Sequence, residues 1–362
     1  MSYGDYPDLS RVKKILVIKL RHLGDVLLSS AVFHALKTAL PQSSLDVLVY
    51  KEAYEILEGH PAIQKILLFD SAWKNNWLKE IRFIQKIRKN SYDLVLNLTE
   101  GDRGAILSKL SRAKIRVGFD SGGRGVWEKE KFYTHVVKKC HTLRHMVERD
   151  LDAIRRIGIH PLPEDRKLIF SIPEEAYTNM DSRLKGLPKD FFLIHPTSRW
   201  RFKCWPIAKV KELILHLLKR EKAVVLASGK DPVELTMVEE LTTGISHPLF
   251  LNLAGKTSLK EFGALIERCY CLICVDSVSF HIASALKHKV VALFGPTSDV
   301  TWGPWQNPLA KVVTQPFSCR PCFQDGCGGG KISDCLQTLS VGRVLEALDI
   351  PVFLHNLKFS PK

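Results

Sequence analysis

The residues best suited to chemistry follow short apolar segments of the chain. Gly24 and Asp25 come soon after one such segment, residues 13–19, and directly before the apolar run that begins at Val26. If the segment is a buried strand, Asp25 lies at the carboxyl edge of a sheet, where a carboxylate can accept the proton of a substrate hydroxyl. Aspartate is also a favoured N-cap residue. The alternative is therefore that Asp25 only caps a helix starting at Val26.

Cations and hydroxyl groups gather after another apolar segment, residues 191–195. They precede the helix that the apolar spacing predicts over 207–220. Point charges and backbone N–H groups near a helix start suit a diphosphate, and the alternative is a solvated basic loop. The candidate diphosphate ligands in this stretch are Thr197, Ser198, Arg199 and Lys203.

A third polar segment, residues 276–281, also follows an apolar segment and begins a predicted helix. Small polar residues at a helix N-terminus favour an anion. His281 lies one turn into that helix and could donate a hydrogen bond to phosphate, although a lone helical histidine is more often structural. After the predicted strand 223–227, Asp231 and Glu234 occupy the place where an acidic residue commonly binds ribose hydroxyls.

Four cysteines lie within seventeen residues near the end of the chain. Four thiols can hold zinc tetrahedrally, but the later spacings depart from those of zinc ribbons. A reduced or disulfide-bonded loop is therefore the preferred interpretation, with a structural metal as the alternative and no metal expected in catalysis. The four residues are Cys319, Cys322, Cys327 and Cys335.

The chain is basic, with 53 Lys and Arg against 38 Asp and Glu among 362 residues, a formal net charge of +15. Residues 1–160 hold 28 of these cations and 18 of these anions, so two thirds of the excess lies in the first half. Such charge attracts polyanions, among them an anionic membrane surface or a phosphorylated acceptor. Nucleic acid is disfavoured, because the sequence has neither a basic motif interleaved with aromatic residues nor zinc-finger spacing.

Targeting signals are not evident in the sequence. No stretch approaches the roughly 18 consecutive apolar residues of a membrane span. Residues 1–11 are polar and contain Asp5 and Asp8, unlike a secretion signal. We therefore expect a cytoplasmic protein.

The elements that must position these residues alternate between strands and helices. Strands are predicted over 13–19, 45–50, 65–69, 92–98, 191–195, 223–227, 272–275 and 290–294, and helices over 26–40, 77–90, 207–220, 259–268 and 280–286. This alternation predicts an α/β protein with two Rossmann-like doubly wound domains facing a central crevice. The expected divisions are residues 1–165, a linker over 166–190, residues 191–340, and a C-terminal helix and tail over 341–362 that could return to the first domain.

Several motifs occur in order along the chain. They are Lys19-x4-Gly24-Asp25, His195–Arg199 with Phe202–Trp205, Leu253–Lys256, Val275–Ser277 with His281–Ala283, and Phe294–Thr297. Together they resemble glycosyltransferase family nine, the ADP-heptose:lipopolysaccharide heptosyltransferases, over about residues 13–350. The resemblance implies a GT-B fold with the acceptor on the first domain and the donor on the second. It also implies an inverting transfer that requires no metal or other cofactor.

The resemblance further implies roles for single residues. Asp25 would be the catalytic base for moving L-glycero-D-manno-heptose from ADP-heptose to a heptose of the lipopolysaccharide inner core. The implied donor contacts are Thr197, Ser198, Arg199, Lys203, Asp231, Glu234, Thr257, Asp276, Ser277, Val278 and His281. Cations of the first half suit the anionic core acceptor; the candidates are Lys19, Arg21, Arg103, Arg124 and Arg144. The expected partners are the lipopolysaccharide core, an ADP-sugar and the anionic cytoplasmic face of the inner membrane, where the protein would be peripheral.

Other functions remain open at this point. A member of the family could use another nucleotide sugar, because a few pocket contacts set donor choice. A non-catalytic protein that binds nucleotides or polyanions would use Asp25 only as a cap. A dinucleotide oxidoreductase is disfavoured, because Gly24 stands without the Gly-x-Gly-x-x-Gly fingerprint.

Overall fold

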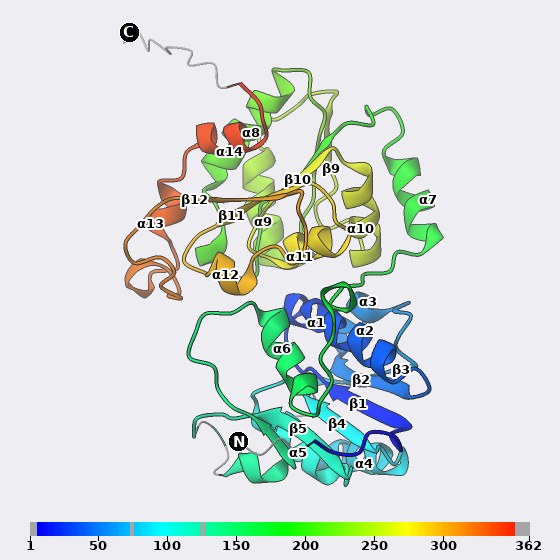
Figure 1. Cartoon of the computed structure of the whole chain (residues 1–362). Helices are drawn as coiled ribbons and strands as arrows, with labels where there is room; N and C mark the ends of the chain where they lie inside the picture. The colour runs from blue at the N-terminus through cyan, green and yellow to red at the C-terminus, as the bar shows by residue number, and fades with distance from the viewer. Residues whose placement is uncertain (1–5, 73–75, 124, 126–127, 352–362) are drawn as a thin grey trace, which may run out of the picture. The chain divides into compact units, whose positions relative to one another are not determined.

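The computed structural model describes residues 6–72, 76–123, 125 and 128–351, and it divides into two compact units (Figure 1). The first unit comprises Met1–Ala176, Ser284–Leu286 and Val300–Gln306. The second comprises Tyr177–Ala283, Lys287–Asp299 and Asn307–Lys362. Each unit contains one sheet of six strands. The division after Ala176 falls within the stretch 166–190 that the sequence marks as a linker.

The first sheet is parallel throughout, with its strands in the order β3-β2-β1-β4-β5-β6. The central strands β1 and β4 are almost completely buried, as apolar strands covered on both faces should be. Chain order reverses between these two strands, and the carboxyl ends at such a switch point form the ligand-binding edge. The strands are β1 (Lys14–Ile18), β2 (Ser44–Tyr50), β3 (Lys65–Phe69), β4 (Leu94–Asn97), β5 (Ile115–Phe119) and β6 (His135–Val137).

Helices cover both faces of the first sheet (Figure 1). On one face α1, α2 and α6 pack against one another, and on the other α4 packs beside α5. Phe83 and Ile87 of α4 lie in a core with Leu16, Leu67 and Phe69 of the sheet, each burial stabilising by about 1.5–3 kcal/mol. The helices are α1 (Leu23–Leu28), α2 (Ser30–Ala39), α3 (Tyr54–Leu57), α4 (Trp77–Lys89), α5 (Asp102–Leu110) and α6 (Met146–Arg155).

The second sheet repeats the topology of the first. Its parallel strands lie in the order β12-β11-β10-β7-β8-β9, so the switch point lies between β7 and β10. The strands are β7 (Phe192–His195), β8 (Val224–Leu226), β9 (Phe250–Asn252), β10 (Cys271–Val275), β11 (Val290–Phe294) and β12 (Ala310–Thr314). Helix α7 (Glu174–Arg183) lies within the linker stretch 166–190. The helices that follow it are α8 (Ile207–Leu218), α9 (Pro232–Thr242), α10 (Leu259–Arg268), α11 (Val278–Ala285), α12 (Asp299–Trp302), α13 (Asp334–Gln337) and α14 (Val341–Ala347).

The C-terminal helix α14 belongs to the core of the second unit. Val344 and Leu345 are buried there with Trp205 and Leu217, and the indole N–H of Trp205 donates to the Leu339 carbonyl at 3.1 Å. The described part of residues 341–362 therefore packs within the second unit, whereas the sequence left open a return to the first. The apolar face of α14 finds its burial against α8 and β12 instead.

Predicted and observed elements differ mainly at their ends. The bounds of β3, α10 and β11 agree with the sequence prediction. Two helices, α1 and α2, replace the single helix expected over 26–40. They are separated at Ser29, whose hydroxyl bonds to the Asp25 carbonyl. The prediction omits strands β5, β6, β9 and β12. Among the described residues no helix is both long and apolar enough to cross a bilayer.

Candidate functional site

Asp25 lies just beyond the carboxyl end of β1, inside the first turn of α1. The helix begins at Leu23 with His22 as N-cap residue, so the alternative that Asp25 caps a helix starting at Val26 is wrong. Its side chain is 10% exposed, and Oδ2 lies 3.9 Å from Nε of Arg21. Oδ1 is buried without a hydrogen-bond partner in the part of the chain that the structure describes. A carboxylate oxygen in that state is disposed to accept a proton from a ligand.

A buried ion pair lies at the same end of β1. Nζ of Lys19 is 2.6 Å from Oδ2 of Asp150 on α6 and 3.4 Å from the Leu98 carbonyl. The side chains of Lys19 and Asp150 are 2% and 1% exposed. The single hydroxyl proton of Ser29 has two acceptors within reach, the same Asp150 oxygen at 2.8 Å and the Asp25 carbonyl at 2.9 Å. Through Ser29, the residue after α1, the pair therefore holds the end of the helix that carries Asp25.

The lysine of this pair is not placed as the sequence led us to expect. Lys19 was predicted to contact the acceptor, but its ammonium group is enclosed and directed at Asp150. A buried ammonium must be paired, and the pairing partner comes from 131 residues away in the chain. The structure therefore gives Lys19 a positioning function in the first unit.

The other predicted acceptor cations differ in how accessible they are. Arg21 has a side chain 52% exposed beside Asp25. Arg103 lies over the Phe69 ring at 4.6 Å and pairs with Glu80. Arg144 forms a two-pronged contact with Asp152, which raises the pKa of its guanidinium. Arg124 lies outside the described residues. Of the described candidates, Arg21 is thus the most accessible to an anionic acceptor.

The second unit carries a related ion pair after its own first strand. Lys203, at the end of a short 3-10 turn (Arg201–Lys203), places Nζ 2.7 Å from Oδ2 of Asp276, which follows β10. Thr297, after β11, donates to the same oxygen at 2.7 Å. The Lys203 side chain keeps 18% exposure, whereas Asp276 has 5%. Three strand ends therefore converge on one carboxylate and leave the lysine partly open to solvent.

The ends of β7 and β8 are joined by Glu234, in the first turn of α9. Glu234 accepts hydrogen bonds from the Thr197 hydroxyl and from the backbone N–H of Gly229. A Cβ at Gly229 would lie 3.1 Å from the Glu234 carboxylate, so a larger residue there would press on this side chain. Asp231 is different, because it is exposed and serves as N-cap residue of α9 by accepting from Val233 N–H. Of the two predicted ribose ligands, Glu234 is the one in the polar cluster.

The remaining predicted donor residues surround these two contacts. The Ser198 hydroxyl accepts a hydrogen bond from the backbone N–H of Trp200. Arg199 is exposed, and its guanidinium carbon lies 5.7 Å from the centroid of the Trp200 ring. Ser277 shares a hydrogen bond of 2.6 Å with Ser279, within the sequence that begins α11 at Val278. Thr257 and His281 are buried, at 8% and 4% exposure. The structure therefore brings residues from five strand ends to one edge of the second sheet.

Burial dominates the state of His195, at the end of β7. Removal from water lowers the pKa of this imidazole, and the neighbouring charge of Glu234 opposes that shift. The ring packs edge-on against Phe262 at 5.1 Å. His195 is thus a buried residue at the end of β7 that packs against an aromatic ring.

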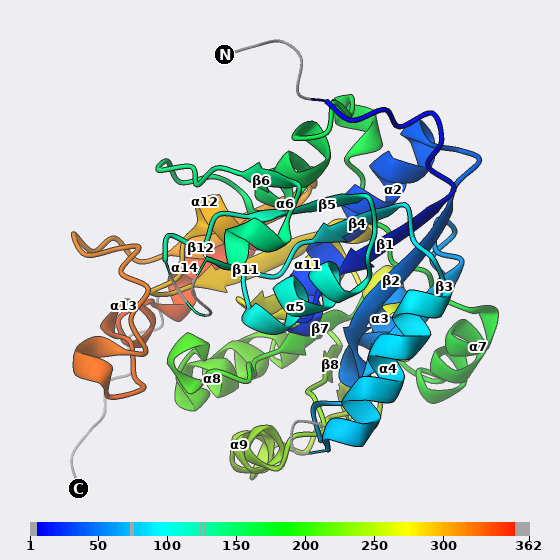
Figure 2. The same ribbon diagram turned by 90° about the horizontal axis from the view of Figure 1, so that it is seen from below.

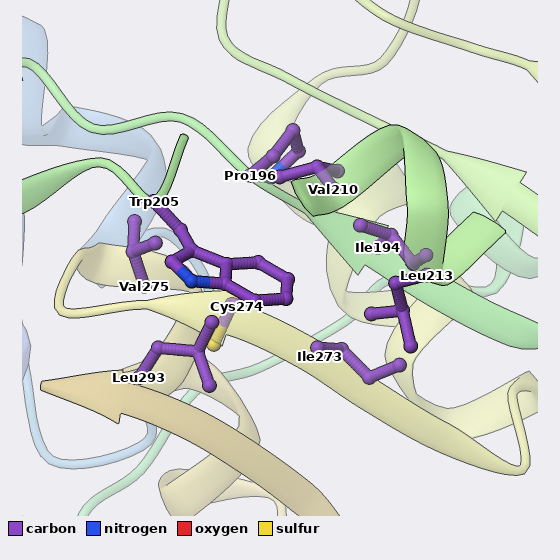
Figure 3. A pocket seen from close by; sticks show the side chains of 9 residues that line it. All are labelled: Ile194, Pro196, Trp205, Val210, Leu213, Ile273, Cys274, Val275 and Leu293. Carbon is purple, nitrogen blue, oxygen red and sulfur yellow. The ribbon is translucent and has the colours of Figure 1, made fainter. Parts of the chain in front are cut away.

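One apolar cavity in the second unit is too small for a nucleotide. A cavity of about 10 Å³ lies under the site, lined by apolar side chains including Trp205, Cys274 and Leu293 (Figure 3). A space of that size has room for about one water and too few polar partners to hold it. The polar residues described above line the edge of the sheet and not this cavity.

The cysteine segment near the C-terminus does not form a recognisable metal centre. Cys319, Cys322, Cys327 and Cys335 are free thiols. Across the described ranges, no three His, Cys, Asp or Glu side chains gather as ligands of one ion. Cys327 instead accepts a hydrogen bond from the backbone N–H of Asp334. Cys335 is buried in α13, whereas the other three thiols lie in the segment before that helix.

Sequence reasoning missed three members of the two clusters. Asp150 and Ser29 complete the Lys19 contact, and Thr297 completes the Asp276 contact. Thr297 had a usable signal, since it follows a buried strand as Asp25 and Asp276 do. Asp150 has no such signal, because it sits within a helix and acts on a partner distant in sequence.

Two doubly wound units with these edges define a class of protein. One edge carries a carboxylate oxygen ready to accept a proton, and the other carries a lysine, hydroxyls and a helix start suited to a diphosphate. That is the organisation of a nucleotide-sugar glycosyltransferase with two Rossmann-like domains, the GT-B class.

The chain belongs to glycosyltransferase family 9, the heptosyltransferases, whose sequence profile matches residues 80–332. It is 33% identical over 309 residues to lipopolysaccharide heptosyltransferase 3 of Escherichia coli (strain K12), which covers 83% of this chain and 88% of that relative. This agrees with a further sequence resemblance, through His145–Arg149 and Trp302–Trp305, to the heptosyltransferase III type. The chain is therefore a transferase, and the family expected from its motifs is confirmed.

Solved structures agree on the fold. The structure of E. coli ADP-heptose lps heptosyltransferase II aligns with a TM-score of 0.76 at 22% identity, covering 93% of this chain and 97% of that chain. The E. coli heptosyltransferase WaaC with ADP aligns with a TM-score of 0.70 at 19% identity, covering 93% and 99%. The predicted α/β fold with two doubly wound domains is confirmed.

Proposed function

We propose that the protein moves L-glycero-D-manno-heptose from ADP-heptose to a heptose of the lipopolysaccharide inner core, with inversion at the anomeric carbon. Membership of the heptosyltransferase family and the 33% identity to lipopolysaccharide heptosyltransferase 3 support this reaction. The names of two structural neighbours support the donor, since one is an ADP-heptose transferase and the other was solved with ADP.

The observation that carries the proposal is the carboxylate of Asp25. Its Oδ1 atom is buried at the switch point of the first sheet, without a partner among the described residues. In the proposed step the acceptor hydroxyl oxygen bonds to the anomeric carbon while the bond to the diphosphate oxygen breaks. The hydroxyl proton goes to Asp25, and the electron pair of the broken bond leaves with ADP.

Lys203 is proposed to stabilise the departing diphosphate. It is now 2.7 Å from Asp276 and partly exposed, so an incoming phosphate can share the ammonium group that Asp276 holds in place. Backbone N–H groups at the start of α11, with the hydroxyls of Thr197, Ser198 and Ser277, would add hydrogen bonds. Preorganised donors of this kind stabilise charge that develops in the transition state. The proposal needs no metal ion for this step.

The rest of the donor is assigned by chemistry and position. Glu234 would accept hydrogen bonds from ribose hydroxyls after exchanging its contact with Thr197, and Thr257 would lie against adenine. Gly255, with a φ of +68°, begins the turn that sets the backbone before Thr257. His281 would support the phosphate loop from within α11.

Arg21 is proposed as the main contact of the first unit with the anionic acceptor. It is half-exposed and 3.9 Å from Asp25, so an acceptor phosphate or carboxylate bound by it would bring a hydroxyl near the base. The acceptor is a membrane lipid, and two thirds of the positive excess lies in residues 1–160. We therefore place the protein in the cytoplasm, attached reversibly to the anionic face of the inner membrane.

The substitution Asp25→Asn tests the proposal. Because Asp25 is in a first helical turn and not at the cap, losing its charge should destabilise α1 by only about 0.3–1 kcal/mol. Turnover of ADP-heptose with a core acceptor should fall about a hundredfold or more, the usual range for a lost general base. Affinity for ADP, measured by calorimetry, should be unchanged. A matched variant, Asp334→Asn in the first turn of α13, should keep normal turnover.

A folded Asp25→Asn protein that binds ADP and transfers heptose at nearly the normal rate would remove Asp25 from the mechanism. If no heptose transfer is found for the unaltered protein but another ADP-sugar is used, the donor assignment fails while the role of the carboxylate can still be measured.

A further inference from the structure

Helix α4 presents apolar side chains to solvent as well as to the core. Phe83 and Ile87 are 6% and 1% exposed and complete the core of the first unit. On a different face, Trp77, Leu78 and Ile81 are 67%, 50% and 42% exposed. At about 100° per residue, these three lie within one third of the helix circumference. The fold therefore buries one apolar face of α4 and leaves a second, in its first two turns, in water.

A stripe of cations adjoins the exposed apolar residues. The helix has five cations and one carboxylate. The carboxylate, Glu80, is engaged by Arg103 of α5 at 3.3 Å, and Arg88 is directed at the Leu110 carbonyl. The remaining cations are spaced by three and four residues, which aligns them along one side of the helix. These exposed cations are Lys79, Arg82, Lys86 and Lys89.

The exposed face is mounted on a fixed support. Arg103 of α5 joins Glu80 of α4 and lies over Phe69 of β3, so α4, α5 and the sheet are tied together. Figure 2 shows α4 and α5 in front of the first sheet, with α4 along its side. Ile106, one turn beyond Arg103 on α5, is also 38% exposed.

We propose that this α4 surface, made of Trp77, Leu78, Ile81 and the four cations, docks onto an anionic phospholipid bilayer. The apolar side chains enter the boundary between headgroups and acyl chains, where tryptophan is favoured, and the cations contact headgroup phosphates. Charge complementarity selects the bilayer over a second copy of this chain, because two such cationic surfaces repel each other. This inference rests on the membrane attachment in the proposed function and names the element that performs it.

Vesicle sedimentation with the full-length protein tests the inference, without nucleotide or acceptor. The probes are vesicles of phosphatidylglycerol and phosphatidylethanolamine and, for comparison, of phosphatidylcholine alone. The unaltered protein should bind the anionic vesicles and release as salt rises. Trp77→Ser/Ile81→Ser should weaken binding at least about tenfold. Lys86→Glu/Lys89→Glu should weaken it about twentyfold or more, since each cation near such a surface contributes roughly fivefold.

A matched pair of changes in the second unit serves as control. Leu215, 48% exposed, and Lys219 lie one turn apart at the end of α8, so Leu215→Ser/Lys219→Glu alters the same chemistry away from α4. Vesicle binding of this variant should stay within about twofold of normal, since long-range charge alone changes little. Circular dichroism of the α4 variants should be unchanged, because Phe83 and Ile87 still fill the core.

Three results would overturn the inference. One is vesicle binding that neither α4 variant weakens more than the control. Another is a dimer that dissociates in the α4 variants while their vesicle binding stays normal, which would assign the surface to a second copy. The third is no binding of the unaltered protein. Turnover on a deacylated, soluble core oligosaccharide keeps these failures apart from the proposed reaction, since the α4 variants should retain it and Asp25→Asn should lose it.

Discussion

The two units share a strand order and place a lysine–aspartate pair after the first strand of each sheet, but the pairs differ in access. In the first unit Lys19 and Asp150 are 2% and 1% exposed, and Ser29 closes the contact. In the second, Lys203 keeps 18% exposure beside Asp276. The same charges at equivalent edges are therefore enclosed in one unit and reachable in the other.

This difference indicates how the same fold can use one ion pair to hold geometry and another to meet an incoming anion. An enclosed pair cannot exchange partners without unfolding its surroundings, so it holds geometry, here the end of the helix that carries Asp25. A reachable pair can give up part of its contact to an incoming anion at lower cost. We therefore expect changes at Lys19 to act mainly on stability and changes at Lys203 mainly on donor binding.

The largest expected effect is that of Lys19→Met. It leaves the Asp150 carboxylate buried without its cation, which should lower the free energy of unfolding by about 3–5 kcal/mol. Urea unfolding followed by circular dichroism measures the change. Replacing both charges, in Lys19→Met/Asp150→Leu, should recover most of the loss, because no charge then remains buried.

The stable double variant also shows whether the ion pair positions Asp25 or only stabilises the fold. If the pair positions Asp25, turnover should stay low in this stable protein while affinity for ADP is normal. Full activity in the double variant would mean that the pair contributes stability alone.

The next effect in size is that of Lys203→Met on the donor. Loss of a charged hydrogen bond to phosphate should weaken ADP binding about ten- to hundredfold, as measured by calorimetry. Stability should fall less than in Lys19→Met, because Thr297 still donates to Asp276 and water can reach the pair. Lys222→Met, an exposed lysine of the same unit, is the control. Unchanged ADP affinity in Lys203→Met would contradict the idea of a reachable pair.

The sequence shows the central strands well, whereas of the edge strands it shows β3 and misses β6, β9 and β12. β1, β7, β10 and β11 are continuous apolar runs covered on both faces, so composition alone marks them. β9 and β12 lie at the two edges of the second sheet and carry half-exposed residues, so their mixed sequences give little signal. Sheet edges are stabilised by pairing with neighbours that no local pattern reveals.

The candidate site divides in the same way. Asp25, Asp276 and Lys203 could be predicted, because each belongs to a polar stretch next to a buried strand. The enclosure of Lys19 could not, since it depends on Asp150, 131 residues away. Sequence patterns locate residues at a sheet edge, but a contact between distant segments decides which of them a ligand can reach.

Acid should destabilise both units through buried histidines. Burial lowers the pKa of His145 in the first unit and of His195 in the second, from an ordinary value near 6.5. Near that pH the unfolded chain binds more protons than the native one. Stability is therefore fully present above about pH 6.5 and falls as the pH drops through that value toward the lowered native pKa. Thermal melting between pH 7.5 and 5.5 measures this loss.

The two histidines can be separated by substitution. His145→Asn keeps an acceptor for the Val147 N–H at the N-cap of α6 and removes the titrating group, so it should flatten the pH dependence. His195→Asn should flatten it too, and the double variant more than either. A pH dependence that survives in the double variant would assign the loss to other groups.

The smallest expected effect is that of chelation on turnover. In the proposed reaction, Lys203 and the start of α11 neutralise the charge of the diphosphate. Both belong to the protein and stay in place when metal ions are removed. EDTA should therefore change the rate of heptose transfer by less than about twofold, because preorganised protein donors supply the stabilisation. Loss of turnover that Mg²⁺ restores would contradict that assignment. Loss accompanied by unfolding and zinc release would instead give the loop of Cys319, Cys322 and Cys327 a structural metal. Under the same chelating conditions, Lys203→Met should remain slow, and added Mg²⁺ should not rescue it, since the cation that the leaving group needs belongs to the protein.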